Sequence, residues 1–214
     1  MIGLASLCKL ILNTARRFVY PFAPSLSKGM GVPLTAITSL IAVNQATSIF
    51  GILFGPVADH FGYKWMMLAG LGMLVFGMGA AGLFPYYHVI LATLFLAGLG
   101  KSVFDLALQA QVGVTVPFRE RAMVVGLMEL SWAGSTLVGI PAIGLAINGW
   151  GWRSAFLIMG GMGLLAAVTF YYFVLRNIES HAPAPRMIGM RELGNSIGNN
   201  RAVKGMLVFC FLFA

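Results

Sequence analysis

Polar and charged side chains recur inside stretches of the sequence that are otherwise apolar. In the first stretch Lys9, Asn13, Arg16 or Arg17, and Tyr20 recur at steps of three and four residues, so they lie on one face of a helix. Neighbouring residues of a helix differ in direction by about 100°, so Arg16 and Arg17 cannot both point squarely the same way. These residue types suit the binding of an anion, and Arg16 continues the stripe better than Arg17.

Two later stretches carry further charges. Lys101 and Asp105 are four residues apart and hence on one helix face, where they either pair with each other or serve a site. Glu129 stands about two helical turns, roughly 12 Å, beyond Arg121, and is expected to face a cavity or a cation. Trp132 lies on the same face as Glu129.

Asn44, in the second apolar stretch, is a weaker candidate, because a hydrogen bond between helices explains such a residue equally well. The full set of predicted cavity residues is Asn13, Arg16, Arg17, Asn44, Lys101, Asp105, Glu129 and Trp132.

Enzyme chemistry finds little support in the sequence. The histidines His60, His88 and His181 fall in loops or at the ends of apolar stretches, where they form neither a metal cluster nor a pair with a nucleophile. Cys8 and Cys210 are far apart and indicate no disulfide framework. We therefore predict no catalytic residues, no metal site and no cofactor.

Composition defines the class of protein that must position these groups. The chain has 214 residues, of which 59% are hydrophobic and only 9% are charged. Soluble domains carry roughly 25% charged residues, so the sequence predicts an all-α, polytopic membrane protein that has the lipid bilayer as a partner. The net charge of +8 does not indicate nucleic acid as a partner, because the basic residues separate apolar stretches instead of clustering with exposed aromatics.

Six stretches are long enough to cross a bilayer, which takes about 20 residues each. We place them at 2–22, 35–57, 65–84, 87–109, 122–147 and 152–175. Residues 1–175 are thus expected to form a six-helix transmembrane domain. The polar segment 176–201, which contains Pro183 and Pro185, is expected to be a cytoplasmic linker, and 202–214 to begin a seventh, truncated helix.

The positions of Lys and Arg predict the orientation in the membrane. Loops after even-numbered spans hold eight of them, whereas loops after odd-numbered spans hold two, Lys28 and Arg153. Cytoplasmic loops carry the excess of basic residues, so the N-terminus is predicted to be cytoplasmic in a multi-pass protein of the inner or plasma membrane.

The loop between the second and third spans carries a recognisable pattern. Gly55, Ala58, Asp59, Gly62 and Lys64 match the signature G-x-L-A-D-R-x-G-R-K that the major facilitator superfamily has at this place. His and Tyr stand where the signature has its first two basic residues.

Further segments resemble the same family. Gly151, Trp152, Arg153 and Phe156 are similar to the G-W-R-x-x-F pattern before the sixth span, and Arg121 lies in a segment similar to the one that enters the fifth. The resemblance implies that Gly55, Asp59, Gly62, Lys64 and Arg121 form a conformational loop motif.

The resemblance also implies an architecture. Members of the family have twelve spans in two halves, and the chain corresponds to the N-terminal half, a 3+3 inverted repeat. An echo of Gly62-Tyr63-Lys64 by Gly151-Trp152-Arg153, 89 residues later, suits such a repeat. Spans one, two, four and five are then expected to line a cavity, and a C-terminal six-helix half is expected as the missing partner.

The function expected from these observations is secondary active transport of a small-molecule solute by alternating access. Three cations against two carboxylates make the pathway slightly positive, which predicts an organic anion or zwitterion as the solute. Burial disfavours a charged carboxylate, so Glu129 or Asp105 is a candidate site for coupling to protons. The alternative is a non-transporting membrane scaffold or receptor built on the same helix bundle.

Overall fold

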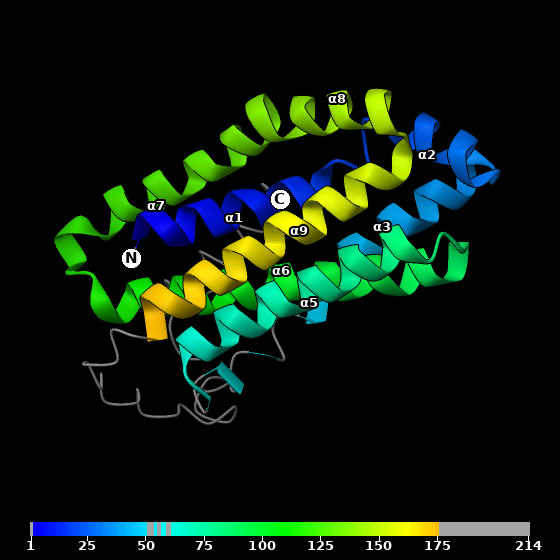
Figure 1. The fold of residues 1–214 in the computed structure, drawn as a ribbon. Helices are drawn as coiled ribbons and strands as arrows, with labels where there is room; N and C mark the ends of the chain where they lie inside the picture. The colour runs from blue at the N-terminus through cyan, green and yellow to red at the C-terminus, as the bar shows by residue number, and fades with distance from the viewer. Residues whose placement is uncertain (1, 51–53, 55–56, 59–60, 176–214) are drawn as a thin grey trace, which may run out of the picture. The chain divides into compact units, whose positions relative to one another are not determined.

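The computed structural model describes residues 2–50, 54, 57–58 and 61–175, and all of the regular structure in this part of the chain is helical. The predicted linker 176–201 and the apolar stretch 202–214 lie outside the described residues. Figure 1 shows the helices in chain order. Their bounds are α1 (Ile2–Arg17), α2 (Ala23–Met30), α3 (Leu34–Phe50), α5 (Tyr63–Leu83), α6 (Tyr87–Thr115), α7 (Phe118–Gly134), the π-helical turn η2 (Ser135–Gly139), α8 (Ile140–Trp150), α9 (Trp152–Phe170) and the π-helical turn η3 (Tyr171–Leu175).

Within the described residues, four helices are long and apolar enough to cross a membrane. They are α5, α6, the continuous helix Phe118–Trp150 that comprises α7, η2 and α8, and Trp152–Phe173. The pair Ala23–Met30 and Leu34–Ser48, bent by 119°, would make a fifth. This confirms an all-α polytopic membrane fold. The first of the six predicted spans corresponds to α1, whose 16 residues reach about 24 Å, less than the roughly 30 Å of a hydrocarbon core.

The first helix ends earlier than the sequence predicted. The expected span was 2–22, but α1 stops at Arg17, and the next residues form hydrogen-bonded turns before α2 begins at Ala23. Pro21 explains the break, because proline lacks the N–H that would continue a helix. Pro24 lies in the first turn of α2, a position that proline tolerates. The two arginines in the last turn of α1 also suit a helix end, where the backbone dipole is negative.

Close helix contacts depend on glycine. A Cβ on Gly70 of α5 would lie 2.5 Å from the carbonyl oxygen of Gly100 in α6, and one on Gly160 of α9 would lie 3.1 Å from the backbone nitrogen of Gly79 in α5. Small residues let membrane helices approach closely where no hydrophobic effect drives them together. The three helices α5, α6 and α9 thus form a tightly packed group.

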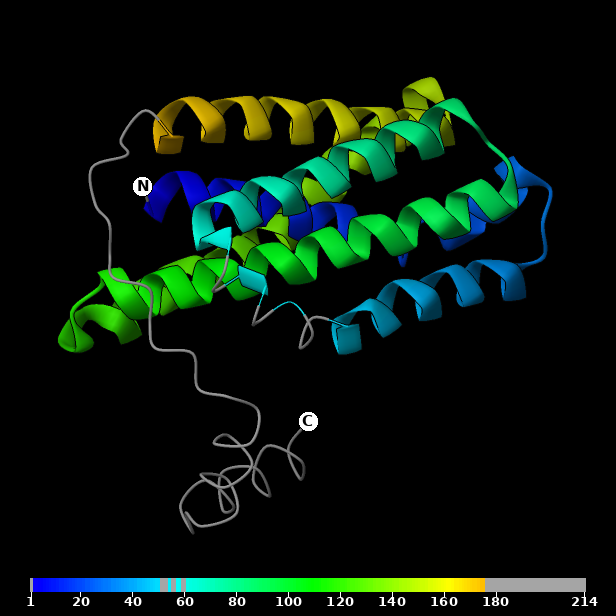
Figure 2. The same ribbon diagram turned by 90° about the horizontal axis from the view of Figure 1, so that it is seen from below.

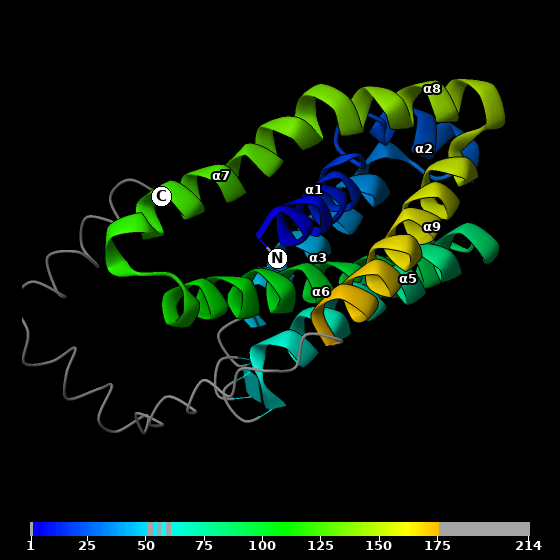
Figure 3. The ribbon, with the colours of Figure 1, turned by 60° about the vertical axis from the view of Figure 1, so that its left-hand side comes forward.

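Helix α1 lies between this group and α7, as Figures 1 and 3 show. Its apolar side is buried, with Leu12 fully enclosed. Just after the helix ends, the buried ring of Phe18 meets that of Phe156 in α9 edge to face at 5.2 Å. Lys9 and Asn13 of α1 are also buried, so they need partners from neighbouring helices.

The inverted repeat has a geometric counterpart. Gly62 and Gly151 both adopt positive φ angles, 87° and 83°, and each immediately precedes a long helix, α5 or α9. This region of φ is open to glycine at little cost, so both positions need glycine for the same turn. The two helices run in opposite directions (Figures 1 and 2), as the two triplets of an inverted repeat require.

The loops gather at two ends of the bundle. Figure 2 shows α2 near the start of α9 at one end, while the start of α5 and the connection from α6 to α7 lie at the other. Lys28 and Arg153 belong to the first end, and Lys64, Arg119 and Arg121 belong to the second. Among the described residues of these loops, the two ends therefore carry two and three basic residues.

The glycine contact predicts a stability difference between two neighbouring substitutions. Gly70→Ala forces α5 away from α6 because the new Cβ meets a backbone oxygen, and we expect a loss of roughly 1–3 kcal/mol, which is typical of overpacking. Gly72→Ala is the matched control, since a Cβ there has no atom within 4 Å. Thermal unfolding in detergent measures both variants, and equal melting temperatures would contradict the packing described.

Candidate functional site

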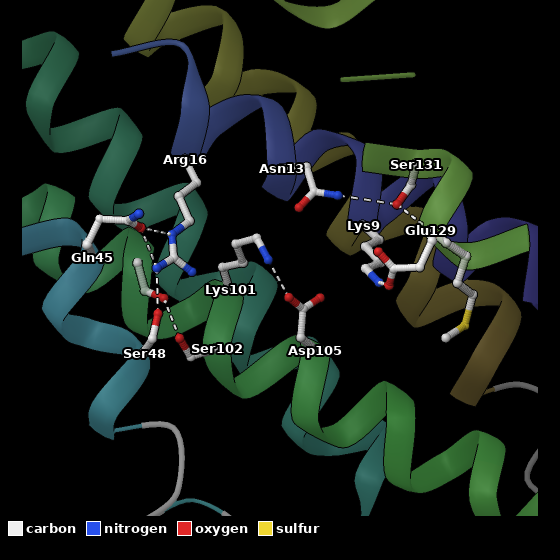
Figure 4. A network of polar contacts seen from close by, with 12 residues as sticks. Lys9, Asn13, Arg16, Gln45, Ser48, Lys101, Ser102, Asp105, Glu129 and Ser131 are labelled. Carbon is white, nitrogen blue, oxygen red and sulfur yellow. Dashed lines mark hydrogen bonds and ion pairs between the residues drawn. The ribbon is translucent and has the colours of Figure 1, made fainter. Parts of the chain in front are cut away.

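A cavity of about 800 Å³ lies between helices of the bundle. Its lining comes from α1 and the turn that follows it, from α3, from α6 and from the α7–η2–α8 helix. The sequence assigned these four segments to spans one, two, four and five, and neither α5 nor α9 contributes a described lining residue. Figure 4 shows some of the polar residues in and beside the cavity. The lining residues are Asn13, Arg16, Arg17, Tyr20, Pro21, Gln45, Lys101, Trp132, Thr136 and Ile140.

Arg16 reaches from α1 toward α3. Its Nε and Nη2 donate to Oε1 of Gln45 at 3.1 and 2.7 Å, and Nη2 also donates to Oγ of Ser48 at 2.5 Å (Figure 4). A guanidinium has five N–H donors, so both donors on Nη1 are left without a partner among the described residues. Arg16 is thus held by neutral oxygens and keeps donors for a further acceptor.

Arg17 reaches the opposite way, toward α7 and η2. Its Nη1 donates to Oγ1 of Thr136 at 2.8 Å, and its Cζ lies 4.2 Å from the ring centroid of Trp132. The π-helical turn that carries Thr136 and the adjacent ring therefore orient this guanidinium. Most of its N–H donors have no partner in the described part of the chain, and the stacking is a cation–π contact.

Lys101 and Asp105 form an ion pair on one face of α6, through Nζ and Oδ2 (Figure 4). Lys101 lines the cavity, but Asp105 is not among the lining residues. The second carboxylate oxygen, Oδ1, is buried and has no hydrogen-bond partner within the described residues. Of the two alternatives expected from the sequence, the structure thus shows the one in which Lys101 and Asp105 pair with each other. One oxygen of Asp105 nevertheless lacks a hydrogen-bond donor among the described residues.

Glu129 forms an ion pair with Lys9, a residue that was not among the predicted cavity residues. Its Oε1 lies 2.6 Å from Nζ of Lys9, whose side chain is 6% exposed while that of Glu129 is 57% exposed. One turn further along α1, Asn13 donates to Oγ of Ser131 at 3.2 Å. The signal for Lys9 was present in the polar stripe of the first helix, but nothing in the sequence showed that its partner would come from α7.

The charges in this part of the bundle do not balance. They comprise four cations and two carboxylates: Lys9, Arg16, Arg17, Lys101, Asp105 and Glu129. Each carboxylate pairs with a lysine, so the two guanidiniums have only neutral partners in the described part of the protein. No group of three or more His, Cys, Asp or Glu there could hold a metal ion. The cavity therefore offers fixed positive charge to an anion.

Asn44 lies elsewhere. It is buried between α3 and α6, where its Nδ2 donates to the carbonyl oxygen of Leu94 at 2.8 Å. A Cβ on Gly98 would lie 2.6 Å from Oγ1 of Thr47 and 3.1 Å from Nδ2 of Asn44, so the helices touch here. Asn44 thus joins two helices, whereas its neighbour Gln45 lines the cavity.

The loop motif is described in part. Gly55 and Asp59 lie outside the described residues. Gly62 begins α5 with its positive φ angle, and Lys64 is half-buried in the first turn of that helix. Arg121 donates from Nε to the carbonyl oxygen of Val116 at 3.0 Å, which closes the turn from α6 to α7.

Comparison with known proteins identifies the fold first. The crystal structure of PepTSo, a POT family transporter, matches 87% of this chain and 39% of its own with a TM-score of 0.67 at 16% sequence identity. The sequence model of the Major Facilitator Superfamily matches residues 5–214 of this chain. The chain therefore belongs to the Major Facilitator Superfamily.

Individual relatives are similar at a lower level. A homolog of the multi-drug resistance efflux pump PmrA from Lactococcus lactis is 25% identical over 91% of this chain and 49% of its own length. Multidrug resistance protein Stp from Mycobacterium tuberculosis is 29% identical over 74% of this chain and 30% of its own length. Multidrug resistance protein 2 from Bacillus subtilis is 26% identical over 91% of this chain and 50% of its own length. The chain spans about half the length of these relatives or less.

The Lys9–Glu129 pair predicts an asymmetric response to substitution. Glu129→Gln leaves a buried ammonium without its carboxylate, and we expect a loss of roughly 1–3 kcal/mol. Lys9→Met should cost less, because the released carboxylate is more than half exposed, and the double substitution should recover part of the loss from Glu129→Gln. A double-mutant cycle on thermal unfolding measures the coupling; additive losses would show that the pair contributes nothing.

Proposed function

We propose that this chain is the N-terminal half of a secondary active transporter that moves a small organic anion or zwitterion by alternating access. The observation that carries the proposal is the cavity lined by α1, α3, α6 and α7–α8, into which two guanidiniums without carboxylate partners are built. Such charges are costly in a membrane protein unless they face water or a ligand. A solute-binding cavity gives them that environment.

The proposed arrangement places the cavity against a second half. Six-helix halves rock around a site near the middle of the bilayer in transporters with internal repeats. We propose that a C-terminal six-helix half completes the site, that segment 176–201 is the cytoplasmic linker to it, and that 202–214 begins its first helix. The loops after even-numbered predicted spans hold eight Lys and Arg residues against two in the other loops, which supports a cytoplasmic N-terminus in a cell membrane.

Coupling to protons is the second part of the proposal. Asp105 has one oxygen paired with Lys101 and one that is buried without a partner. A buried carboxylate with an unsatisfied oxygen is costly in its charged form, and binding of a proton would remove that charge. Glu129 is the other candidate carboxylate, with more than half of its side chain exposed. Asp105 and Glu129 are therefore the two carboxylates that we propose for coupling.

Uptake by the complete gene product in proteoliposomes tests the transport proposal. Arg16→Gln removes one of the two unpaired cations, and we expect anion uptake to fall at least tenfold while membrane insertion persists. Arg153→Gln is the control, because this arginine lies at the start of α9 outside the cavity and contacts Trp152. Equal uptake in the two variants would remove the proposed site, and absence of any uptake in the wild type would favour the scaffold or receptor alternative.

A second experiment isolates proton coupling. Asp105→Asn keeps the shape of the side chain but cannot bind and release a proton. We expect this variant to exchange labelled solute across the membrane without responding to an imposed pH gradient. Uptake that is still driven by the gradient would assign coupling to another group, with Glu129→Gln as the next variant to measure.

A further inference from the structure

The cavity combines its unpaired cations with exposed aromatic surface. Trp132 is 53% exposed and Tyr20 is 42% exposed, and both line the same cavity as Arg16 and Arg17. A buried Trp or Tyr would serve packing, but rings left this accessible in a cavity can contact a bound solute. Aromatic rings are large apolar contact surfaces that favour stacking or edge-to-face geometry with a second ring.

We infer that the solute is an aromatic organic anion, and that the cavity discriminates against zwitterions and cations. The inference rests on the proposed function, because it names the class of solute for the same cavity. The acid group of the solute is bound by free N–H donors of the two arginines, and its ring lies against Trp132 and Tyr20.

The discrimination against an ammonium group follows from the lining. None of the described lining residues is a carboxylate, and both carboxylates beside the cavity are paired with lysines. The ring of Trp132 would be the remaining attraction for a cation, but Arg17 already lies 4.2 Å from its centroid. A second cation at that ring would be repelled by the first, so an ammonium finds no unpaired carboxylate among the described lining residues.

The arrangement of the arginines supports recognition of an acid group. Arg16 is fixed by α3 and Arg17 by η2, so the two guanidiniums are held by different neighbours of α1 and both line the cavity. Each keeps N–H donors that no described residue accepts. Charge-assisted bonds from a guanidinium to a carboxylate or sulfonate are shorter and stronger than neutral ones, and the fixed forks lose little entropy when they form.

Three matched probes separate the charge requirement. Hydrocinnamate carries a phenyl ring and a carboxylate, phenylalanine adds an ammonium, and phenethylammonium keeps the ammonium alone. Titration calorimetry with the complete gene product in detergent is expected to give hydrocinnamate at least tenfold tighter binding than either of the others. Phenylalanine binding as tightly as hydrocinnamate, or no binding by any probe, overturns the inference.

A saturated probe and two variants of Trp132 test whether the solute must be aromatic. Cyclohexanepropionate has the charge and size of hydrocinnamate without the π system, and we expect it to bind several-fold more weakly. Trp132→Leu should abolish that difference, whereas Trp132→Phe should retain it. Trp150→Leu is the control, because this tryptophan is 78% exposed at the end of α8 and does not line the cavity. An unchanged preference in folded Trp132→Leu overturns the role of the ring.

These outcomes are distinguishable from failure of the proposed function. Equal binding of the saturated and aromatic acids, together with loss of uptake in Arg16→Gln, would overturn the aromatic inference and leave anion transport standing. Anion-selective binding without uptake would leave the inference standing and overturn transport.

Discussion

Charge in a low-dielectric environment is the constraint on which this bundle depends. Helix α1 carries three cations, and each is held by a different arrangement: Lys9 by a carboxylate of α7, Arg16 by amide and hydroxyl oxygens of α3, and Arg17 by a hydroxyl of η2 and the ring of Trp132. These contacts fix the rotation of α1 relative to its neighbours. Phe18, which directly follows α1, then packs against Phe156 of α9.

The division of partners between lysines and arginines has a physical reason. A lysine ammonium is a compact and strongly hydrated charge, so its burial calls for a carboxylate, which Lys9 and Lys101 both have. A guanidinium spreads its charge over a plane and can be held by neutral oxygens and an aromatic ring. The result is that the positive charge left over is concentrated at Arg16 and Arg17, both of which line the cavity.

Local patterns predicted much of this from the sequence. Hydrophobicity located the long helices, helical periodicity placed Asn13 and Arg16 on one side of α1, and the glycine-led motifs located the turns at Gly62 and Gly151. The sequence placed the end of the first helix at residue 22, whereas α1 ends at Arg17. The position at which proline ends a helix depends on the turn that follows, which the sequence did not show. The π-helical turn at Ser135–Gly139 has no clear pattern in the sequence.

Pairings over long separations could not be predicted in the same way. Lys9 and Glu129 are 120 residues apart, so only the packing of α1 on α7 shows that they meet. The sequence did not determine the rotation of α3 about its axis either, because the apolar residues of that helix are spread over most of its sides. Its rotation turns Asn44 toward α6 and Gln45 toward the cavity, although the two residues are adjacent.

The central claim is that the hollow between these helices is watery and positive, and thiol labelling tests it most directly. Ile140→Cys places a thiol in the lining, and Leu145→Cys places one on the exposed side of α8, in a protein whose two native cysteines are replaced by alanine. The account predicts that a sulfonate methanethiosulfonate modifies the Ile140→Cys thiol faster than the trimethylammonium reagent, relative to free thiol, and that Leu145→Cys shows no such preference. An unreactive Ile140→Cys thiol, or faster modification by the cationic reagent, would contradict it.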